Sequence, residues 1–317
     1  MGFLSNIFRP RVDLQGPLVV REAQPGELQR CLRMILSSAA GPADDGQVVT
    51  FAQSAKARGI DPSRMLVAAI GDRVVWAALP VVFPGRTAIY LSGTVTDSQQ
   101  PAAREVVNAL LARHTQQGVR LAQVLLDPAE SAARGFYEAC GFTYLAELVY
   151  LEAKAKALEV KSPAAFELVN YSAGLHGEFA TAIQASYRDT LDCPGLTGLR
   201  DIEDVIAGHK SAGAFGERFW FMAREGGEPR GVLLLSPVPP SDAMELVYIG
   251  LAPEARRRGL SDALMRLAFG TAARAGCLRL TTAVDSQNAP ALRMYLRHGM
   301  HRIGSRVAMM KVLPTPT

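Results

Sequence analysis

The sequence has few cysteines, no metal-ligand pattern and little net charge. Its cysteines lie far apart without a CxxC pair, which argues against a zinc site and a disulfide-stapled scaffold: Cys31, Cys140, Cys193 and Cys277. The histidines show no metal-ligand spacing, so we expect no metal. Lys plus Arg number 34 and Asp plus Glu number 30, and a surplus of +4 this scattered does not indicate a nucleic-acid wrapper.

Long apolar runs are also missing. The most apolar stretches, residues 65–70 with 74–83 and residues 231–240, are interrupted by charges or prolines and fall short of the roughly 18–20 residues that span a bilayer. Residues 1–10 lack the apolar core of a secretory signal, and Asn6 stands where a myristoylation motif needs Ser or Thr. We therefore expect a cytoplasmic protein that does not bind membranes.

The chain has the length and apolar content of two packed domains. Its 317 residues exceed one average domain. Hydrophobic residues make up 49% and charged residues 20%, which gives no compositional reason to expect disorder.

Hydrophobic periodicity predicts the same order of elements twice. The first half is predicted to contain strand 18–22, helices 25–37 and 48–58, strands 64–70, 73–82 and 87–95, helix 102–116, strand 120–126, helix 129–140 and strand 143–151. The second half is predicted to contain strand 166–170, helices 177–187 and 202–210, strands 218–224, 230–236 and 244–251, helix 260–275, strand 277–283, helix 289–298 and strand 301–312.

The two halves also match residue by residue. Residues 88–112 align with the second half at an offset of 157 and residues 127–142 at an offset of 158, with these matches: Gly93 with Gly250, Gly141 with Gly299 and Tyr137 with Tyr295. Residues 152–163, rich in Lys and Ala and ending in Pro, are typical of a short helical or extended linker. We predict a tandem duplication with domains at 1–151 and 165–317 and a linker at 152–164.

The segment Glu245–Met265 carries the most informative motif. A β-rich run is followed by a proline, three arginines at 256–258, Gly259 and the start of an amphipathic helix. A glycine lets the backbone approach an anion closely, a helix N-terminus offers unpaired N–H groups and a positive dipole end, and the arginines add charge. The loop predicts a phosphate site, with a solvated basic turn as the alternative.

Together with Asp285–Met300, this loop resembles motifs A and B of the GNAT superfamily of acyl-CoA N-acyltransferases. The matching residues are Arg256, Gly259, Asn288, Ala291, Tyr295 and Gly299, with Ser261 in the last small position of motif A and Met300 in place of a Phe. The resemblance covers residues 165–313 well and 17–151 more weakly. It implies an α+β fold, an α/β/α sandwich of two tandem GNAT-like domains, each a mixed, mostly antiparallel twisted sheet flanked by helices.

The resemblance implies acetyl-CoA as cosubstrate and a primary amine as acceptor. In the family the strand before the loop separates from its neighbour, strand backbone groups pair with pantetheine and loop N–H groups hold the pyrophosphate. The implied contacts are Ile249, Gly250, Leu251, Arg256, Arg257, Arg258, Gly259, Leu260, Ser261 and Asn288. One group must accept the ammonium proton and another must protonate the leaving thiolate, and the resemblance assigns these roles to Glu245 and Tyr295.

Several of these residues also have purely structural interpretations. Glu245 could be an exposed strand residue, Tyr295 a core aromatic with a satisfied hydroxyl, and Asn288 a helix cap. The turn-rich segment Thr190–Asp201 lies where the family commonly builds acceptor contacts. Cys193 within it invites a nucleophile role, but a buried structural thiol is the preferred interpretation.

The first half has lost the matching site residues. The replacements are Ala88 for Glu245, Gln99–Pro101 for Arg256–Arg258, Ala102 for Gly259 and Glu130 for Asn288. Without the glycine and the arginines the loop loses close backbone approach and charge, and Pro101 removes an N–H donor. Only Tyr137 is retained, so we predict a degenerate domain without turnover.

We therefore expect an N-acetyltransferase, monomer or homodimer, whose C-terminal domain moves an acetyl group from acetyl-CoA to a primary amine. The leading alternative is a non-catalytic acyl-CoA-binding sensor or scaffold, because a fold does not guarantee turnover. A nucleic-acid-binding module is disfavoured, because the arginines form one loop without interleaved aromatics. The sequence identifies neither the amine, nor the acyl chain length, nor any ligand of the first domain.

Overall fold

The computed structural model describes residues 16–38, 41–159 and 163–315, so the predictions made for residues 1–10 lie outside it. The first half contains β1 (Leu18–Glu22), α1 (Leu28–Leu36), α2 (Asp45–Ala57), β2 (Leu66–Ile70), β3 (Arg73–Phe83), β4 (Thr87–Ser92), α3 (Gln100–Gln116), β5 (Leu121–Leu126), α4 (Ser131–Ala139) and β6 (Thr143–Lys154). The second half contains β7 (Glu167–Asn170), α5 (His176–Ser186), α6 (Ile202–Lys210), β8 (Trp220–Glu225), β9 (Glu228–Pro237), β10 (Ala243–Leu251), α7 (Leu260–Arg274), β11 (Arg279–Asp285), α8 (Ala289–Arg297) and β12 (His301–Val312). Among these elements, no helix combines the length and apolarity that a membrane span requires.

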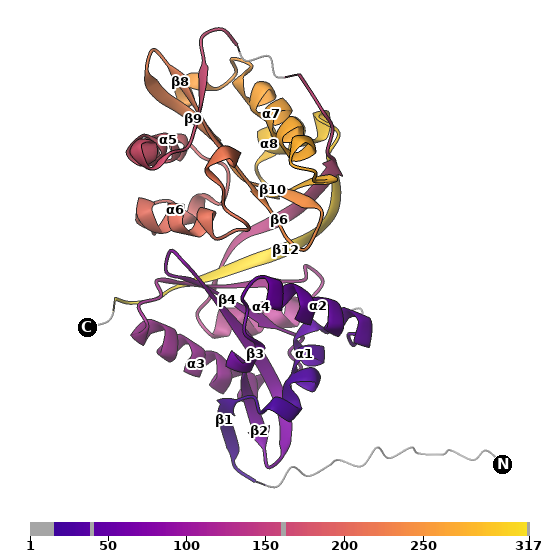
Figure 1. Cartoon of the computed structure of the whole chain (residues 1–317). Coiled ribbons are helices and arrows are strands. Elements are labelled where there is room, and N and C mark those ends of the chain that lie inside the picture. The colour runs from indigo at the N-terminus through magenta and orange to yellow at the C-terminus, as the bar shows by residue number, and fades with distance from the viewer. Residues whose placement is uncertain (1–15, 39–40, 160–162, 316–317) are drawn as a thin grey trace, which may run out of the picture.

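The described strands form one twelve-stranded sheet in the order β1-β2-β3-β4-β5-β12-β6-β11-β10-β9-β8-β7 (Figure 1). Neighbouring strands are antiparallel except for β4 with β5 and β10 with β11, which are parallel. The predicted mixed, mostly antiparallel sheet is confirmed. The predicted hairpin between β2 and β3 is confirmed too, and Gly71 adopts a φ of 57° in its turn.

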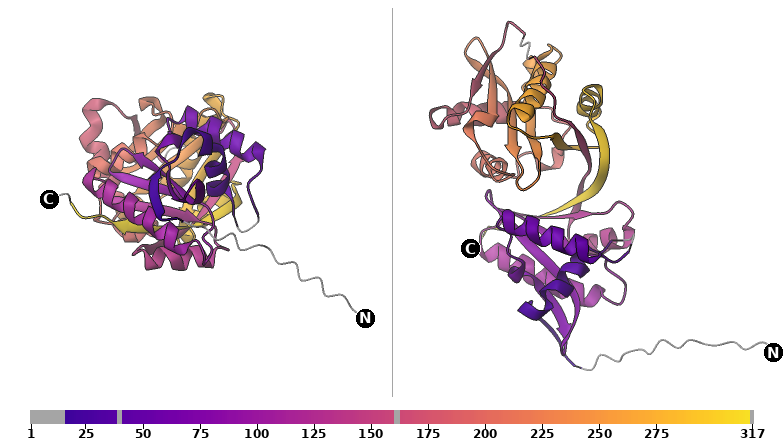
Figure 2. Two further views of the ribbon diagram at one scale, coloured as in Figure 1. Left: turned by 90° about the horizontal axis from the view of Figure 1, so that it is seen from below. Right: turned by 45° about the vertical axis from the view of Figure 1, so that its right-hand side comes forward.

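The last strand of each half lies in the sheet of the other half. β6 pairs with β11, and β12 pairs with β5, while β6 and β12 pair with each other at the centre. Figure 2 shows β12 running from the C-terminal half into the N-terminal one. We call β1–β5, β12 and α1–α4 the N-terminal lobe, and β6–β11 and α5–α8 the C-terminal lobe.

β6 extends three residues into the segment 152–164, which the sequence analysis assigned to a linker. Residues 152–154 continue β6 and pair with residues 279–281 of β11. This pairing, and not their Lys/Ala composition, decides their extended conformation. Residues 160–162 of the linker lie outside the described residues. The division at residues 151 and 165 stays a prediction about the chain, because the lobes share strands across it.

Helices cover both faces of the sheet. In β2, Leu66 and Ala68 pack in a core with α3 and α4, whereas Val67 packs in a core with α1 and α2. Burial on both faces explains why β2 is apolar throughout. Figure 1 shows α5 and α6 on one side of the C-terminal lobe and α7 and α8 on the other, all joined to one core cluster. The predicted α/β/α sandwich is confirmed.

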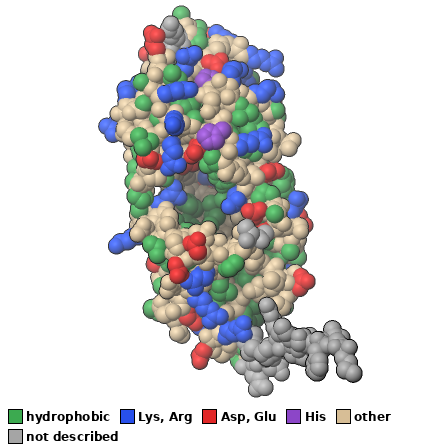
Figure 3. Space-filling view, turned by 90° about the vertical axis from the view of Figure 1, so that its right-hand side faces the viewer, with side chains coloured by type: hydrophobic (Ala, Val, Ile, Leu, Met, Phe, Trp, Pro, Cys, Tyr) green, Lys and Arg blue, Asp and Glu red, His purple; other side chains and the backbone are tan. Residues whose placement is uncertain are grey.

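The turn between β3 and β4 docks onto α6 of the other lobe. Gly85, with a φ of 84°, lies so close to the Asp204 carbonyl that a Cβ atom would collide with it. Arg86 pairs with Asp201 and Asp204, each at 2.5 Å. The N-terminal lobe therefore holds the first turn of α6. A hollow remains between the lobes on the face seen in Figure 3.

Candidate active site

β10 and β11 separate in the middle of their length. They pair only over Ala243–Glu245 and Arg279–Thr281, although β10 continues to Leu251 and β11 to Asp285. Beyond the pairs, the edge of β10 that faces β11 has no strand partner in the described chain, so its backbone groups can pair with a ligand. The separation implied by the family resemblance is confirmed, and Glu245 is the last paired residue before it. We call the opening the notch.

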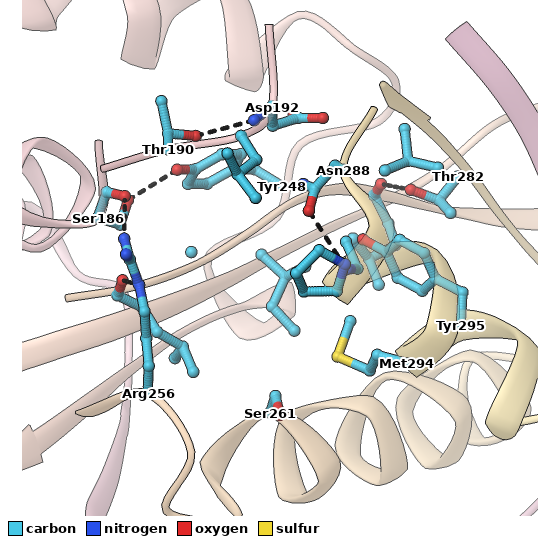
Figure 4. Close-up of a pocket in the computed structure, with 18 of the residues that line it drawn as sticks. Ser186, Thr190, Asp192, Tyr248, Arg256, Ser261, Thr282, Asn288, Met294 and Tyr295 are labelled. Atoms are coloured by element: carbon cyan, nitrogen blue, oxygen red, sulfur yellow. Dashed lines mark hydrogen bonds between the residues drawn. The ribbon is translucent and has the colours of Figure 1, made fainter. Parts of the chain in front are cut away.

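A cavity of about 620 Å³ fills the notch. Its walls come from β10, β11, the end of α5 and the starts of α7 and α8, as Figure 4 shows. The predicted residues that line it are Ile249, Gly250, Leu251, Arg256, Arg257, Ser261, Asn288 and Tyr295. Glu245, Arg258, Gly259 and Leu260 are not among the described lining residues.

The loop before α7 has the backbone of an anion site. Gly259 caps α7 with a φ of 79°, a conformation that favours glycine, and Arg257 has a φ of 61°. The first bond at this end joins the Ala263 N–H to the Gly259 carbonyl at 3.3 Å, so the N–H groups before it lack an intrahelical acceptor. These N–H groups and the helix dipole favour a negative group beside the cavity.

Two of the three loop arginines are already engaged. The Arg256 guanidinium donates to the carbonyls of Ser186 at 3.2 Å and Arg188 at 2.5 Å, at the end of α5. Arg258 donates to the Glu225 carboxylate at 2.9 and 2.5 Å. Arg256 keeps its positive charge and lines the cavity, since its partners are neutral carbonyls at a helix C-terminus, whereas a carboxylate pairs with Arg258. The assignment of all three arginines to the ligand stays a prediction. Arg257 makes no hydrogen bond or ion pair in the described part of the chain.

Gly250 is required by packing as well as by the predicted backbone contact. A Cβ atom there would lie 2.5 Å from Ser186 Oγ and 2.6 Å from Tyr248 Oη. These two hydroxyl groups form a hydrogen bond of 2.7 Å between α5 and β10 (Figure 4). At the matching position in the first half, a Cβ on Gly93 would collide with the Met34 carbonyl of α1. The repeated glycine thus lets the first long helix of each half approach the sheet.

Tyr295 and Asn288 lie where α8 borders the notch. Tyr295 is 4% exposed and its hydroxyl bonds to the Thr282 side chain. Burial raises the pKa of Tyr295, so the phenol keeps its proton at neutral pH and can donate it. Asn288 caps α8 by accepting the Ala291 N–H at 3.3 Å, which confirms the cap interpretation, and its side chain also bonds to Asp192.

Glu245 lies half-buried at the apex of the notch. Burial raises the pKa of its carboxyl group, and the positive charge of Arg58 opposes that shift. Tyr150 of the exchanged strand β6 lies near enough to feel the Glu245 charge. Arg58 and Tyr150 both belong to the first half of the chain, so the surroundings of Glu245 come partly from that half. A raised pKa makes the carboxylate a stronger base.

A second cavity, of about 500 Å³, opens beside the first. We call it the side cavity, and it shares four lining residues with the notch cavity: Thr190, Asp192, Val247 and Tyr248. Much of its wall is the segment Thr190–Asp201, which the resemblance linked to the acceptor. Burial raises the pKa of Cys193 to about 12, so its sulfur stays a thiol at neutral pH, in agreement with the structural interpretation.

Asp192 is a site residue that sequence reasoning did not select. The Asp285 N–H donates to its carboxylate at 3.1 Å, and the Asp285 carboxylate accepts the Cys193 N–H at 3.1 Å. Burial raises the pKa of Asp192. Asp192 and Asp285 lie 93 positions apart in the sequence, so only their hydrogen bonding in the structure shows that Asp192 belongs to the site.

Comparison with known proteins agrees with this geometry. Residues 185–300 match the family model described as "Acetyltransferase (GNAT) family". This range contains the loop before α7 and the four residues that line both cavities. No curated protein sequence is significantly similar to the chain.

Solved structures extend the likeness to nearly the whole chain. A GCN5-related N-acetyltransferase from Sphaerobacter thermophilus has a TM-score of 0.63 at 16% identity, covering 95% of this chain and 98% of its own. A tandem GNAT protein from the clavulanic acid biosynthesis pathway has a TM-score of 0.50 at 15% identity, covering 95% and 99%. A glucosamine N-acetyltransferase region of a fungal multi-domain β-N-acetylglucosaminidase has a TM-score of 0.62 at 13% identity, covering 94% and 38%.

Fold, notch and motif define the class of protein. Residues 185–300 match the model of the GNAT acetyltransferase family, and the chain as a whole shares its fold with solved structures of GNAT proteins, a tandem one among them. Members of this family are acyltransferases that use acyl-CoA, and the notch of this chain has the parts that such a ligand needs.

Proposed function

We propose that the protein is an N-acetyltransferase that moves an acetyl group from acetyl-CoA to a primary amine in its C-terminal lobe. The observation that carries the proposal is the notch, where an unpaired strand edge, a roomy cavity and the glycine-capped start of α7 lie together. The strand edge suits the amide groups of pantetheine. The N–H groups before α7 suit the pyrophosphate.

The proposed reaction uses two proton-transfer groups. The amine nitrogen attacks the thioester carbonyl, the new C–N bond forms, and the C–S bond then breaks with its electron pair on sulfur. Glu245 accepts the ammonium proton and Tyr295 returns a proton to the thiolate of CoA. Because Glu245 lies outside the cavity lining, we propose that its proton travels through one intervening water.

We propose that the N-terminal lobe has no turnover of its own. The matching strands β4 and β5 pair over Thr87–Ile89 and Leu121–Gln123, so the strand arrangement of the notch is repeated there. The hydroxyl group of Tyr137, the counterpart of Tyr295, forms a hydrogen bond of 2.7 Å with the hydroxyl group of Ser92 in β4. Glycine, arginines and glutamate are missing there together, so the groups that would bind acyl-CoA and transfer protons are absent.

The sequence also resembles one particular tandem-domain enzyme, mycothiol synthase, in two features. These are the duplication itself and the strand Glu245–Tyr248 leading into the arginine loop. We keep this likeness as a prediction.

A panel of primary amines tests the proposed function. The full chain should release free CoA thiol from acetyl-CoA with at least one amine, above the rate without protein. The rival role, a non-catalytic acyl-CoA sensor, predicts tight acetyl-CoA binding by calorimetry and no amine-dependent release. Failure to bind acetyl-CoA at all would contradict both.

A further inference from the structure

The side cavity is a partly open chamber between α5, α6 and the segment that joins them. Tyr187 and Arg188 line it beside α5, while Ile202, Val205 and His209 line it on α6. Its connection to the notch is the stretch of wall that both cavities share, including Asp192 and Tyr248. An acceptor bound in this chamber would therefore have one end at the notch and the other end deep against α6.

At the α6 end the chamber contains a cation without a counter-ion. Arg200 lines the cavity, and its Nη2 donates to the Asp204 carbonyl at 3.0 Å. The Asp204 carboxylate itself pairs with Arg86 of the other lobe at 2.5 Å. In the described part of the chain Arg200 forms no ion pair, and its buried Nε has no hydrogen-bond partner. A half-buried guanidinium with a spare buried donor favours an anionic ligand.

A neutral histidine lies beside this arginine. His209 stacks on the Tyr248 ring with centroids 5.3 Å apart and an interplanar angle of 21°. Burial, with the nearby Arg200 charge, lowers the pKa of His209 to about 4, so it carries no charge at neutral pH. Its Nε2 is buried and has no partner within the described residues. It therefore adds a second polar atom to the same wall without adding charge.

At the notch end the chamber contains a carboxylate without a counter-ion. Asp192 takes hydrogen bonds from the Asp285 N–H at 3.1 Å and from Asn288, and it forms no ion pair within the described chain. The other arginine of the chamber, Arg188, is already paired with Glu254 at 2.8 Å. The walls between the two ends are largely apolar, with Leu196, Ile202, Val205 and Val247 among them.

We propose that the acceptor is a zwitterion, an amino acid whose amine and carboxylate are separated by an apolar chain, whose carboxylate binds Arg200 and His209 and whose amine faces Asp192 at the notch. The inference rests on the proposed acetyl transfer. It adds the acceptor class, because one unpaired cation and one unpaired carboxylate at opposite ends of an apolar chamber match the two charges of such a molecule. Arg200 is then a specificity-determining residue, and Gly208 is needed beside it, because a Cβ there would lie 2.8 Å from its Nη2.

The test uses pairs of amines that differ only in the carboxylate. 6-Aminohexanoic acid is compared with pentylamine and 8-aminooctanoic acid with heptylamine, with CoA release by the full chain as the readout and rates expressed per neutral amine. The carboxylated member should have at least a roughly 10-fold higher kcat/KM. In Arg200→Gln its KM should rise roughly 10- to 100-fold with little change for the matched amine, the size expected for one hydrogen bond to a charged group. Arg200→Lys should restore part of the loss.

Arg188→Gln is the matched control, since it removes a paired arginine from the same chamber and should leave the preference unchanged. Acetyl-CoA titration of each variant checks that the notch is intact. Equal rates for both members of each pair in the parental protein would overturn the inference and leave the proposed function standing. An Arg200→Gln variant that weakens both members equally would also overturn it. Absence of CoA release with every amine, despite acetyl-CoA binding, would instead overturn the proposed function.

Discussion

The Gly259→Trp variant should lose acetyl-CoA binding and still fold. A Cβ at this position would lie 3.8 Å from Pro163 Cγ and meet nothing else within 4 Å, so the protein itself has room for a side chain. The positive φ of 79° makes any side chain there cost about 1–2 kcal/mol of stability. If the loop N–H groups hold the pyrophosphate, losing two such bonds removes about 3–6 kcal/mol of binding. Calorimetry should therefore show acetyl-CoA bound roughly 100-fold more weakly or not at all.

The chain offers a control for backbone strain at the other end of the same helix. Gly276 has a φ of 77° and open space around its Cβ direction. It follows the 15-residue helix α7, so the two glycines, 17 positions apart (276 − 259), lie about 25 Å apart at 1.5 Å per residue. Gly276→Trp should lower Tm as much as Gly259→Trp and leave acetyl-CoA affinity unchanged. Parental affinity in Gly259→Trp would refute the pyrophosphate assignment, and equal losses in both variants would show that strain is the cause.

Two further predictions concern the proton-transfer groups and the exchanged strands. Glu245→Gln and Tyr295→Phe should each slow turnover by about 10²–10⁴-fold with acetyl-CoA affinity nearly intact. Because burial raises the pKa of Glu245, the rate should fall as the pH drops through this raised pKa, which lies above the pKa of an ordinary glutamate. The Glu245→Gln variant should regain part of its rate at high pH, where more of the amine is neutral. A parental rate in Glu245→Gln together with a dead Asp192→Asn would move the base to Asp192. Residues 1–159 and 160–317, expressed together as separate chains, should purify as one complex, while the first piece alone should release no CoA and the second alone should lose stability or solubility. Separate elution of two well-folded pieces, or a fully active second piece, would contradict the strand exchange.

The element order could be predicted from the sequence because local patterns are strong here. β2 and β3 alternate or run apolar around Gly71, and the start of α7 coincides with Gly259. The exchange of β6 and β12 could not be predicted in the same way. In a duplicated chain each last strand can pair equally well with its own sheet or with the sister sheet, so periodicity is the same in both arrangements. Only the register of β6 against β11 distinguishes them.

The site was predictable where one loop carries it and not where distant segments meet. The Arg256–Ser261 loop and the Asp285–Met300 segment carry their spacing within one stretch of chain each. The engagement of Arg256 with carbonyls near Ser186 depends on a contact across 70 residues, and the pairing of Asp192 with Asp285 spans 93. The sequence therefore predicted Arg256 at the site but not its bonds to these carbonyls, and it passed over Asp192, Arg200 and His209.

The retention of a first half without its own site residues has a physical reason in these contacts. Its strand β6 lies between β11 and β12, beside the strand that forms one wall of the notch. Its Arg86 engages Asp204, the residue whose carbonyl accepts Arg200, and Leu145 of β6 lies 3.2 Å from the Cβ position of Gly195 in the segment that encloses the side cavity. Arg58 adds charge near Glu245. The first half can therefore lose its own acyl-CoA site and still need its fold. Its strands and turns support the walls of the notch that keeps the full motif.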